Sequence, residues 1–324
     1  MKNILVTGCA GFIGFHLCES LLKKKYKKYN IHGIDNLNNY YSSILKKKRL
    51  NFLKKEKQFF FTKIDISDNK KISRFFKLNK FDIIFHLAAE PGVRNSIFFP
   101  NKYIRPNIIG FFNIIDLARE HNIKKVVYAS SSSVYGNSET LPTLENYRKA
   151  PESFYAFSKY ANEQMAELYS KIYNINFIGL RFFTIFGEWG RPDMLIGKVI
   201  AACLENKKFD LNFYGKHKRD FTYVADAIKM INRLYKKKLK QKHSVFNICS
   251  NRPVSLKKIV NIFRKHFKKI TFKKRKHQKG DVYITHGSNN KLKRIIGDIN
   301  ITPIDQSLMK TINWYKSNLS FINK

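Results

Sequence analysis

Three glycines separate the first apolar run of this chain from the amphipathic segment that follows it. The stretch "VTGCAGFIGFH" places Gly8, Gly11 and Gly14 directly after the apolar run 3–7. Glycines at such a junction allow a tight turn and a close approach of backbone N–H groups to a phosphate, and the start of a helix adds partial positive charge. The spacing is G-x-x-G-x-x-G, which alone is a weak signal, because chance loops also carry glycines. With a strand before it and a helix after it, the segment is a candidate dinucleotide loop that includes Phe12 and Ile13.

The first half of the chain alternates short apolar runs with longer amphipathic ones. Strands are expected at 3–7, 31–35, 58–62, 82–87, 124–130 and 175–181, and helices near 12–25, 41–55, 68–77, 101–121 and from Tyr155 onward. Strands separated by helices indicate βαβ units and a parallel sheet. Loops rich in Gly, Pro and charge are expected at 186–193 and 214–221, before a further helix (223–236) and strand (244–249).

This order predicts an α/β fold with a Rossmann-type doubly wound parallel sheet and a smaller, interleaved C-terminal domain. The dinucleotide-binding domain would span residues 1–180 and about 222–249. The substrate domain would span 181–221 and about 250–324.

An acidic residue ends the second expected strand. Asp35 stands 21 positions after Gly14. A carboxylate there can accept hydrogen bonds from an adenosine ribose and repel a 2′-phosphate, which favours NAD over NADP. Asp65 follows the third strand and has two interpretations that stay open here, a contact to adenine or a helix cap.

The charge of the chain is extreme. The formal net charge is +39, from 62 Lys and Arg against 23 Asp and Glu. Such a charge suggests a nucleic acid or an anionic surface as partner. The lysines, however, are scattered through every segment, and abundant Asn, Ile and Phe accompany them, as A+T-rich codons would produce. We therefore favour compositional drift and expect no specific nucleic acid partner.

The remaining composition points to a cytoplasmic protein. The cysteines form no C-x-x-C pair and no metal-ligand spacing with His, so we expect reduced thiols and no metal. No signal peptide precedes the first strand, and no apolar run approaches the roughly 20 residues that a membrane helix needs, so no membrane partner is expected.

The segment "SFYAFSKYANE" carries a tyrosine and a lysine four residues apart. On a helix, Tyr155 and Lys159 would share one face. A nearby ammonium lowers the pKa of a phenol by favouring the phenolate, which makes Tyr155 a candidate general base. The pair alone is common by chance, and the glycine loop upstream makes it more specific.

Over nearly its full length the sequence resembles the extended short-chain dehydrogenase/reductases. The matching stretches are "VTGCAGFIG", "FHLAA", "SSSSVYG", "YAFSK", "LRFF" and "RDFTYV". Within that superfamily, "LRFFTIFGEWGRPDM", "GVRNS" and "GDVYITH" resemble the UDP-glucuronate 4-epimerases. The resemblance implies a tightly held NAD, a nucleotide-sugar substrate oxidised transiently at C4, and a homodimer formed through the helices near 101–121 and 155–172. It also implies cofactor contacts from Ile66, Leu87, Ala88 and Ala89, together with Tyr155 and Lys159.

The resemblance assigns a role to each part of the serine run that ends the fifth strand. Ser131 corresponds to the catalytic hydroxyl that bonds the sugar O4 and orients Tyr155. Ser132 and Ser133 fall where related dehydratases carry an Asp-Glu pair and decarboxylases carry a Glu. Serines in place of these carboxylates favour simple oxidation and return of the hydride.

The same resemblance implies a set of substrate contacts. Thr184 and Arg191 would hold the C6 carboxylate, with Ser132 or Ser133 assisting. Arg219 would hold the UDP phosphates and Asp281 the uridine ribose, and Arg94 has a substrate contact or a structural role. A bidentate Arg suits a carboxylate geometrically. Glu188 replaces a usual Pro and adds a negative charge near this region.

The sequence therefore predicts an NAD-dependent 4-epimerase that interconverts UDP-glucuronate and UDP-galacturonate. Its alternatives are a 4-epimerase of UDP-glucose or UDP-N-acetylglucosamine, a UDP-glucuronate decarboxylase, and, from another class, a basic RNA-binding protein on a Rossmann scaffold.

Overall fold

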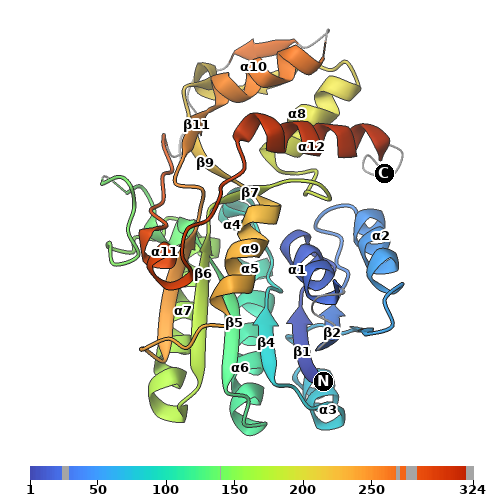
Figure 1. Cartoon of the computed structure of the whole chain (residues 1–324), viewed down its shortest axis with the longest axis vertical. Coiled ribbons are helices and arrows are strands. Elements are labelled where there is room, and N and C mark those ends of the chain that lie inside the picture. Colours follow the sequence, from blue (N-terminus) through green and yellow to red (C-terminus); the bar gives the residue numbers. More distant parts are fainter. Residues whose placement is uncertain (24–28, 139, 268–270, 275–282, 319–324) are drawn as a thin grey trace.

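The protein is built around one parallel sheet of seven strands, shown by a computed structural model that describes residues 1–23, 29–138, 140–267, 271–274 and 283–318 (Figure 1). The strand order is β10-β6-β5-β4-β1-β2-β3. Their bounds are β1 Lys2–Thr7, β2 Tyr29–Asp35, β3 Phe59–Lys63, β4 Ile83–His86, β5 Lys125–Ser131, β6 Asn176–Phe182 and β10 His243–Ile248. The reversal of strand order beside β1 is that of a doubly wound sheet, and the predicted α/β fold class is confirmed.

Both faces of this sheet are buried, which explains the continuous apolar runs of its strands. Neighbouring residues of β1 point to opposite sides, so that Ile4 and Val6 pack in one core cluster and Leu5 in the other. The first cluster includes the apolar faces of α1 (Phe12–Leu22) and α9 (Val224–Leu234). The second includes those of α3 (Asn69–Leu78), α6 (Gly110–Glu120) and α7 (Phe154–Tyr173). Helix α2 (Ser43–Leu53) packs beside α1.

The helix expected over 101–121 is not a continuous α-helix. It consists of α5 (Asn101–Tyr103), a π-helical turn η2 (Ile104–Ile109) and α6. Pro106 lies inside η2 and has no N–H to donate, so an ordinary i→i−4 ladder is interrupted at that residue. A short helix α4 (Val93–Phe98) precedes this segment.

A second layer lies beyond the carboxyl ends of the central strands, in the upper half of Figure 1. Strands β7 (Thr184–Phe186), β9 (Lys218–Tyr223) and β11 (Pro253–Ser255) form a small mixed sheet, and β8 (Phe209–Leu211) pairs with β12 (Phe272–Lys274). Helices α8 (Leu195–Leu204), α10 (Leu256–His266) and α12 (Ile304–Ser317) surround them, and α11 (Asn290–Ile296) lies beside β10. The expectation of a loop over 214–221 is wrong from Lys218 onward, because β9 begins there and pairs on both sides.

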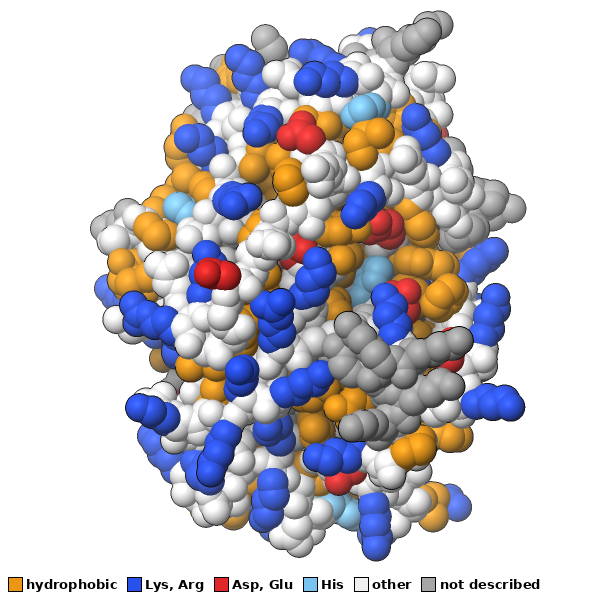
Figure 2. All heavy atoms as spheres, in the orientation of Figure 1, with side chains coloured by type: hydrophobic (Ala, Val, Ile, Leu, Met, Phe, Trp, Pro, Cys, Tyr) orange, Lys and Arg blue, Asp and Glu red, His pale blue; other side chains and the backbone are white. Residues whose placement is uncertain are grey.

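The basic side chains cover the surface without a single focus. Figure 2 shows Lys and Arg over every part of the visible face and few acidic side chains among them. Part of the acidic complement is buried instead, namely Asp35, Glu90, Glu145, Glu163, Asp220 and Asp226. No helix in the described part of the chain has the length and apolarity needed to cross a membrane.

Exposed apolar side chains gather on the segment η2–α6 and on α7, which contact each other. They are Ile104, Ile109, Phe112, Phe157, Leu168 and Ile172. These are the two helical regions from which the sequence predicts a homodimer contact.

Candidate active site

A cavity of about 850 Å³ opens at the carboxyl ends of the central strands and reaches the β7–β9 layer. Every described residue for which the sequence predicts a cofactor, catalytic or substrate role lines it. These residues are Gly8, Gly11, Phe12, Ile13, Gly14, Asp35, Asp65, Ile66, Leu87, Ala88, Ala89, Arg94, Ser131, Ser132, Ser133, Tyr155, Lys159, Thr184, Arg191 and Arg219. Asp281 lies outside the described residues.

The glycine loop forms one wall of this cavity, and its backbone leaves no room for side chains. Gly8 has φ +72°, and a Cβ atom there would lie 2.7 Å from the backbone nitrogen of Ala88. A Cβ atom on Gly14 would lie 2.1 Å from the carbonyl oxygen of Gly8. The first turn of α1 can therefore approach the strand end closely, as a bound diphosphate requires.

Asp35 is tied to this loop by its backbone. Its carboxylate accepts hydrogen bonds from the Ala10 N–H at 3.1 Å and the Leu37 N–H at 2.8 Å. Burial raises the pKa of Asp35, and the hydrogen bond from Leu37 and the nearby ammonium of Lys46 oppose that shift. Each carboxylate oxygen keeps acceptor capacity towards the cavity.

Asp65 does not cap the helix that follows it. The cap of α3 is Asp68, which accepts from the Lys71 N–H at 3.1 Å. Asp65 instead accepts from the N–H and hydroxyl of Ser67 and from the side-chain amide of Asn36. Of its two predicted interpretations, the helix cap is wrong, and the adenine contact stays a prediction.

Tyr155 and Lys159 lie in the first turns of α7, whose first N–H groups are capped by Ser153. The Lys159 ammonium lies 6.0 Å from the centre of the Tyr155 ring and donates to the carbonyl oxygen of Ala129 at 2.9 Å. Burial lowers the pKa of Lys159 to about 8. Burial also raises the pKa of Tyr155, and the influences that lower it come from a hydrogen bond with Ser131 and from the charge of Arg191. Ser131 and Arg191 thus oppose the effect of burial on the pKa of Tyr155, and the predicted contribution of Lys159 stays a prediction.

The four serines separate into distinct roles at the end of β5. The Ser130 hydroxyl donates to Glu163 in the interior. The Ser131 hydroxyl oxygen accepts from the Ser133 N–H at 3.2 Å and from the Ser133 hydroxyl at 2.8 Å, which caps the short 3₁₀ helix η3 (Ser132–Tyr135). Because its oxygen accepts these bonds, the one O–H of Ser131 remains to donate either to Tyr155 or to a substrate oxygen.

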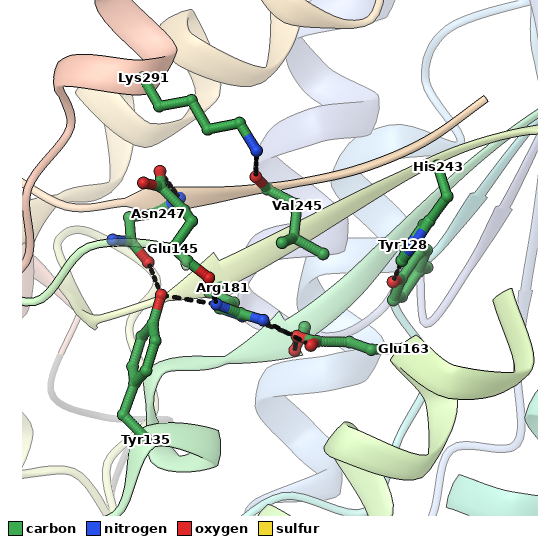
Figure 3. A network of polar contacts seen from close by, with 10 residues as sticks. Tyr128, Tyr135, Glu145, Glu163, Arg181, His243, Val245, Asn247 and Lys291 are labelled. Carbon is green, nitrogen blue, oxygen red and sulfur yellow. Dashed lines mark hydrogen bonds and ion pairs between the residues drawn. The ribbon is translucent and has the colours of Figure 1, made fainter. Parts of the chain in front are cut away.

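A buried network supports the catalytic segments from behind (Figure 3). The Arg181 guanidinium on β6 binds both carboxylate oxygens of Glu163 on α7, at 2.8 and 2.7 Å. Its third nitrogen donates at 2.8 Å to the Tyr135 hydroxyl and to the Glu145 carbonyl oxygen. The Tyr135 hydroxyl donates in turn to Asn247 on β10 at 2.7 Å. The network thus joins strand β6, helix α7 and the segment that follows the serines.

Sequence reasoning missed Asn107. Its side-chain oxygen accepts from the Glu90 N–H at 2.7 Å, and its amide nitrogen donates to the Glu90 carbonyl oxygen at 3.1 Å and to the Ser158 hydroxyl at 3.0 Å. It therefore joins the loop after β4 to the residue that precedes Lys159. The signal was present, since Asn107 directly follows Pro106 within an otherwise helical pattern.

Arg191 and Thr184 lie in the cavity wall formed by the second layer. Arg191 makes a two-fold hydrogen-bonded ion pair with Asp193 and lies 5.3 Å from the centre of the Tyr40 ring. Glu188 turns elsewhere and accepts from the Tyr223 hydroxyl at 2.7 and 2.9 Å. The negative charge beside Arg191 is thus that of Asp193.

Arg94 and Arg219 reach the cavity from other directions. Arg94 lies on α4, and Arg219 lies on β9, where it donates to the backbone carbonyl oxygens of Lys218 at 2.9 Å and Tyr283 at 3.2 Å. Together with Arg191, these residues bring arginines to the cavity from three separate segments, and Lys46, Lys159 and Lys198 also line it, an arrangement suited to an anionic ligand.

Comparison with known proteins decides the family. Residues 4–249 match the NAD dependent epimerase/dehydratase family. The chain belongs to this family. Among its relatives, an uncharacterized protein of Methanocaldococcus jannaschii is 42% identical, covering 99% of this chain and 98% of that protein. UDP-glucuronate 4-epimerase 1 of Arabidopsis thaliana is 34% identical, covering 99% of this chain and 78% of the relative.

Solved structures of epimerases match this chain over nearly its whole length. UDP-glucuronic acid 4-epimerase from Bacillus cereus, in complex with UDP-glucuronic acid and NAD, matches with a TM-score of 0.90 and 29% identity, covering 98% of this chain and 99% of that one. UDP-glucose 4-epimerase from Thermotoga maritima, with UDP-glucose, matches with a TM-score of 0.88 and 25% identity, covering 98% and 100%. The comparisons indicate an NAD-dependent 4-epimerase of a UDP-sugar.

NAD is the cofactor of this epimerase family member, and the site fits it. The close packing of Gly8 and Gly14 lets the first turn of α1, from Phe12 to Gly14, line the cavity where a diphosphate lies in dinucleotide-binding folds. The Asp35 carboxylate stands at the end of β2 in the same cavity, where it can accept hydrogen bonds from a ribose.

Proposed function

We propose that this epimerase interconverts UDP-glucuronate and UDP-galacturonate. The observation that carries the proposal is the position of Arg191, which lines the cavity and lies close enough to Tyr155 for its charge to lower the pKa of that phenol. A guanidinium beside the catalytic tyrosine offers a two-point contact to a carboxylate on the reacting sugar. The 34% identity to a plant UDP-glucuronate 4-epimerase supports the same substrate.

The residues around the glycine loop hold the cofactor. We assign the diphosphate to Gly8, Gly11 and Gly14, and the adenosine ribose to Asp35, all of which line the cavity. NAD, when bound, takes up a hydride from C4 of the sugar and returns it.

Tyr155 is the general base, and two neighbours support it. It removes the proton of the C4 hydroxyl and later gives it back, while Ser131 donates a hydrogen bond that favours its phenolate. Lys159, fixed on the Ala129 carbonyl oxygen, holds its ammonium 6.0 Å from the tyrosine ring. Ser132 and Ser133 carry no acid that could drive elimination of water or loss of a carboxylate.

The oxidised sugar poses a chemical difficulty that the site must meet. With a ketone at C4, the C6 carboxylate of a glucuronate becomes that of a β-keto acid, which loses CO₂ when the C5–C6 bond aligns with the carbonyl π system. An epimerase must hold the carboxylate out of that alignment while the sugar turns over. We assign this restraint to Arg191 and Thr184, which line the same wall of the cavity.

The test follows a label at C6 into CO₂. Arg191→His and Thr184→Ala should slow epimerisation and divert part of the flux to CO₂ and a UDP-4-keto-pentose. Arg219→Ala is the matched control, since it removes a cavity-lining cation assigned to the UDP phosphates. It should raise KM without changing the products, as loss of uniform binding does. If Arg191→His and Thr184→Ala release no more labelled CO₂ than the parent protein, the restraint is refuted.

A second candidate is a 4-epimerase of UDP-glucose or UDP-N-acetylglucosamine. It is favoured by the near-equal structural match to the Thermotoga maritima enzyme and by a TM-score of 0.87 to a UDP-N-acetylglucosamine 4-epimerase from Methanobrevibacter ruminantium. Faster turnover of UDP-glucose than of UDP-glucuronate by the parent protein would establish this candidate. Stoichiometric release of CO₂ from UDP-glucuronate by the parent would instead identify a decarboxylase.

A further inference from the structure

Arg191 is engaged side-on by a carboxylate two residues away. Its Nε donates to Asp193 Oδ1 at 3.0 Å, and its Nη2 donates to Asp193 Oδ2 at 2.6 Å. The side chains are 17% and 32% exposed, so that the pair lies in the cavity wall and not in open solvent. Burial opposes the charge of Arg191, and the hydrogen bonds and charge of Asp193 outweigh that effect and raise its pKa.

Two tyrosines cover the same guanidinium. Its central carbon lies 5.3 Å from the Tyr40 ring centre and 5.7 Å from the Tyr41 ring centre. Cation–π contacts of this kind restrict how a guanidinium can tilt. The ion pair with Asp193 limits rotation of the Arg191 guanidinium within its own plane, and the two rings limit its tilt out of that plane.

One of these tyrosines, Tyr41, is itself held by a buried arginine. Arg49, fully buried on α2, donates to the Tyr41 hydroxyl at 2.6 Å and to the Ala10 carbonyl oxygen in the glycine loop at 2.8 Å. It also donates to the carbonyl oxygen of Trp189, two residues before Arg191. The loop that carries Arg191 is thus joined to the cofactor loop through one side chain.

The side-on contact with Asp193 does not use the Nη1–Nη2 edge of the Arg191 fork, and the Tyr40 hydroxyl is a further hydrogen-bond partner of the guanidinium. Of the five N–H donors of a guanidinium, Asp193 uses one on Nε and one on Nη2. Both N–H groups of Nη1 and the second one of Nη2 point away from Asp193. This Nη1–Nη2 edge has the geometry that binds a carboxylate through two parallel hydrogen bonds.

We propose that Asp193 is a positioning residue that holds Arg191 side-on, so that the substrate carboxylate meets only the Nη1–Nη2 edge. The proposal rests on the proposed function, because Asp193 would fix the orientation in which Arg191 holds the C6 carboxylate of the substrate. A guanidinium without Asp193 still attracts the carboxylate, but it can rotate with it. Loss of Asp193 should therefore loosen the orientation of the substrate carboxylate more than its binding.

The test is Asp193→Asn, which keeps the shape of the side chain and removes its charge. We expect UDP-glucuronate to bind at least as tightly as to the parent, because a competing carboxylate is gone, while the labelled CO₂ released per epimerisation rises severalfold. Glu188→Gln is the matched control, because it removes a carboxylate from the same loop whose partner is Tyr223. That variant should leave the CO₂ fraction at the parent value.

The outcomes separate this proposal from the proposed function. If Arg191→His raises the CO₂ fraction and Asp193→Asn does not, the role of Asp193 is refuted and the proposed function stands. If Arg191→His does not raise the CO₂ fraction either, the carboxylate restraint assigned to Arg191 is refuted, and the role of Asp193 is refuted with it. Weaker binding and slower turnover of Asp193→Asn with an unchanged CO₂ fraction would mark Asp193 as structural only and refute the proposal. Asp193→Ser, measured in the same way, replaces the Asn variant if that variant does not fold.

Discussion

Replacing Glu163 by glutamine should destabilise this protein far more than the same replacement four residues further along the same helix. Glu163 and Arg181 are both almost fully buried, with 3% and 2% of their side chains exposed. Glutamine can accept one hydrogen bond from Arg181, but its amide nitrogen would face the second guanidinium donor. The variant also leaves a buried charge without its counter-charge, which destabilises a protein by roughly 3–5 kcal/mol.

The expected change in melting temperature follows from the size of the chain. For 324 residues, an unfolding entropy of about 2.1 cal/mol/K per residue converts this loss into a decrease of about 4–7 °C in Tm. Differential scanning calorimetry of the purified protein at pH 7 and constant NAD concentration measures it, since bound cofactor itself raises Tm.

A matched control exists on the same helix. Glu167 pairs with Lys171 at 2.7 Å, but their side chains are 44% and 69% exposed. An exposed pair of this kind contributes about 0.3–0.5 kcal/mol, so Glu167→Gln should lower Tm by less than about 1 °C. Adding Arg181→Met to Glu163→Gln should cost less than the sum of the two single changes, because no unpaired charge then remains. Equal melting temperatures for Glu163→Gln and Glu167→Gln would refute the reasoning.

Three further predictions concern the active site and the assembly. Tyr155→Phe should lower kcat by roughly two to four orders of magnitude with NAD still bound, and near-normal turnover would remove Tyr155 from the mechanism. Asp35→Ala should shift the ratio of NAD to NADP affinity towards NADP, measured by titration of the apoprotein, and an unchanged ratio would place cofactor selection elsewhere. We also propose a homodimer through the apolar face of α6 and α7, so that Phe112→Asp with Phe157→Asp should give monomers by sedimentation. Phe60→Asp, at an exposed position on β3, should leave the assembly as it was, and a parent protein that sediments as a monomer contradicts the proposal.

The sequence predicted those parts of the fold and site that local patterns encode. The glycine loop stands out because a strand, a turn and a helix each leave their own signature within the first 22 residues. Tyr155 and Lys159 stand out because a spacing of four residues defines one helix face. The central strands were predictable because burial on both faces makes them continuous apolar runs.

The sequence could not predict features that depend on residues meeting in space. Glu163 and Arg181 are 18 residues apart, and neither carries a sign of burial until α7 packs on β6. Strands β7 and β11 have three residues each, too few to show an alternation. In the sequence, nothing distinguishes Asp193 from other loop carboxylates, and only the side-chain conformations show that it accepts two hydrogen bonds from Arg191.

Because part of the acidic complement is buried, ionic strength should have opposite effects on substrate capture and on the proposed dimer. At least six of the 23 acidic side chains are buried, against four basic ones (Lys46, Arg49, Lys159 and Arg181), so that the formal charge of +39 lies almost wholly at the surface. At low salt, a doubly charged diphosphate is drawn to the cavity from a distance and capture of substrate is fast. The same field would repel a second copy of the chain, so the proposed dimer should form more readily once salt shortens the Debye length to about 8–10 Å. We therefore expect substrate capture to be fastest at the low ionic strength that most opposes the proposed assembly.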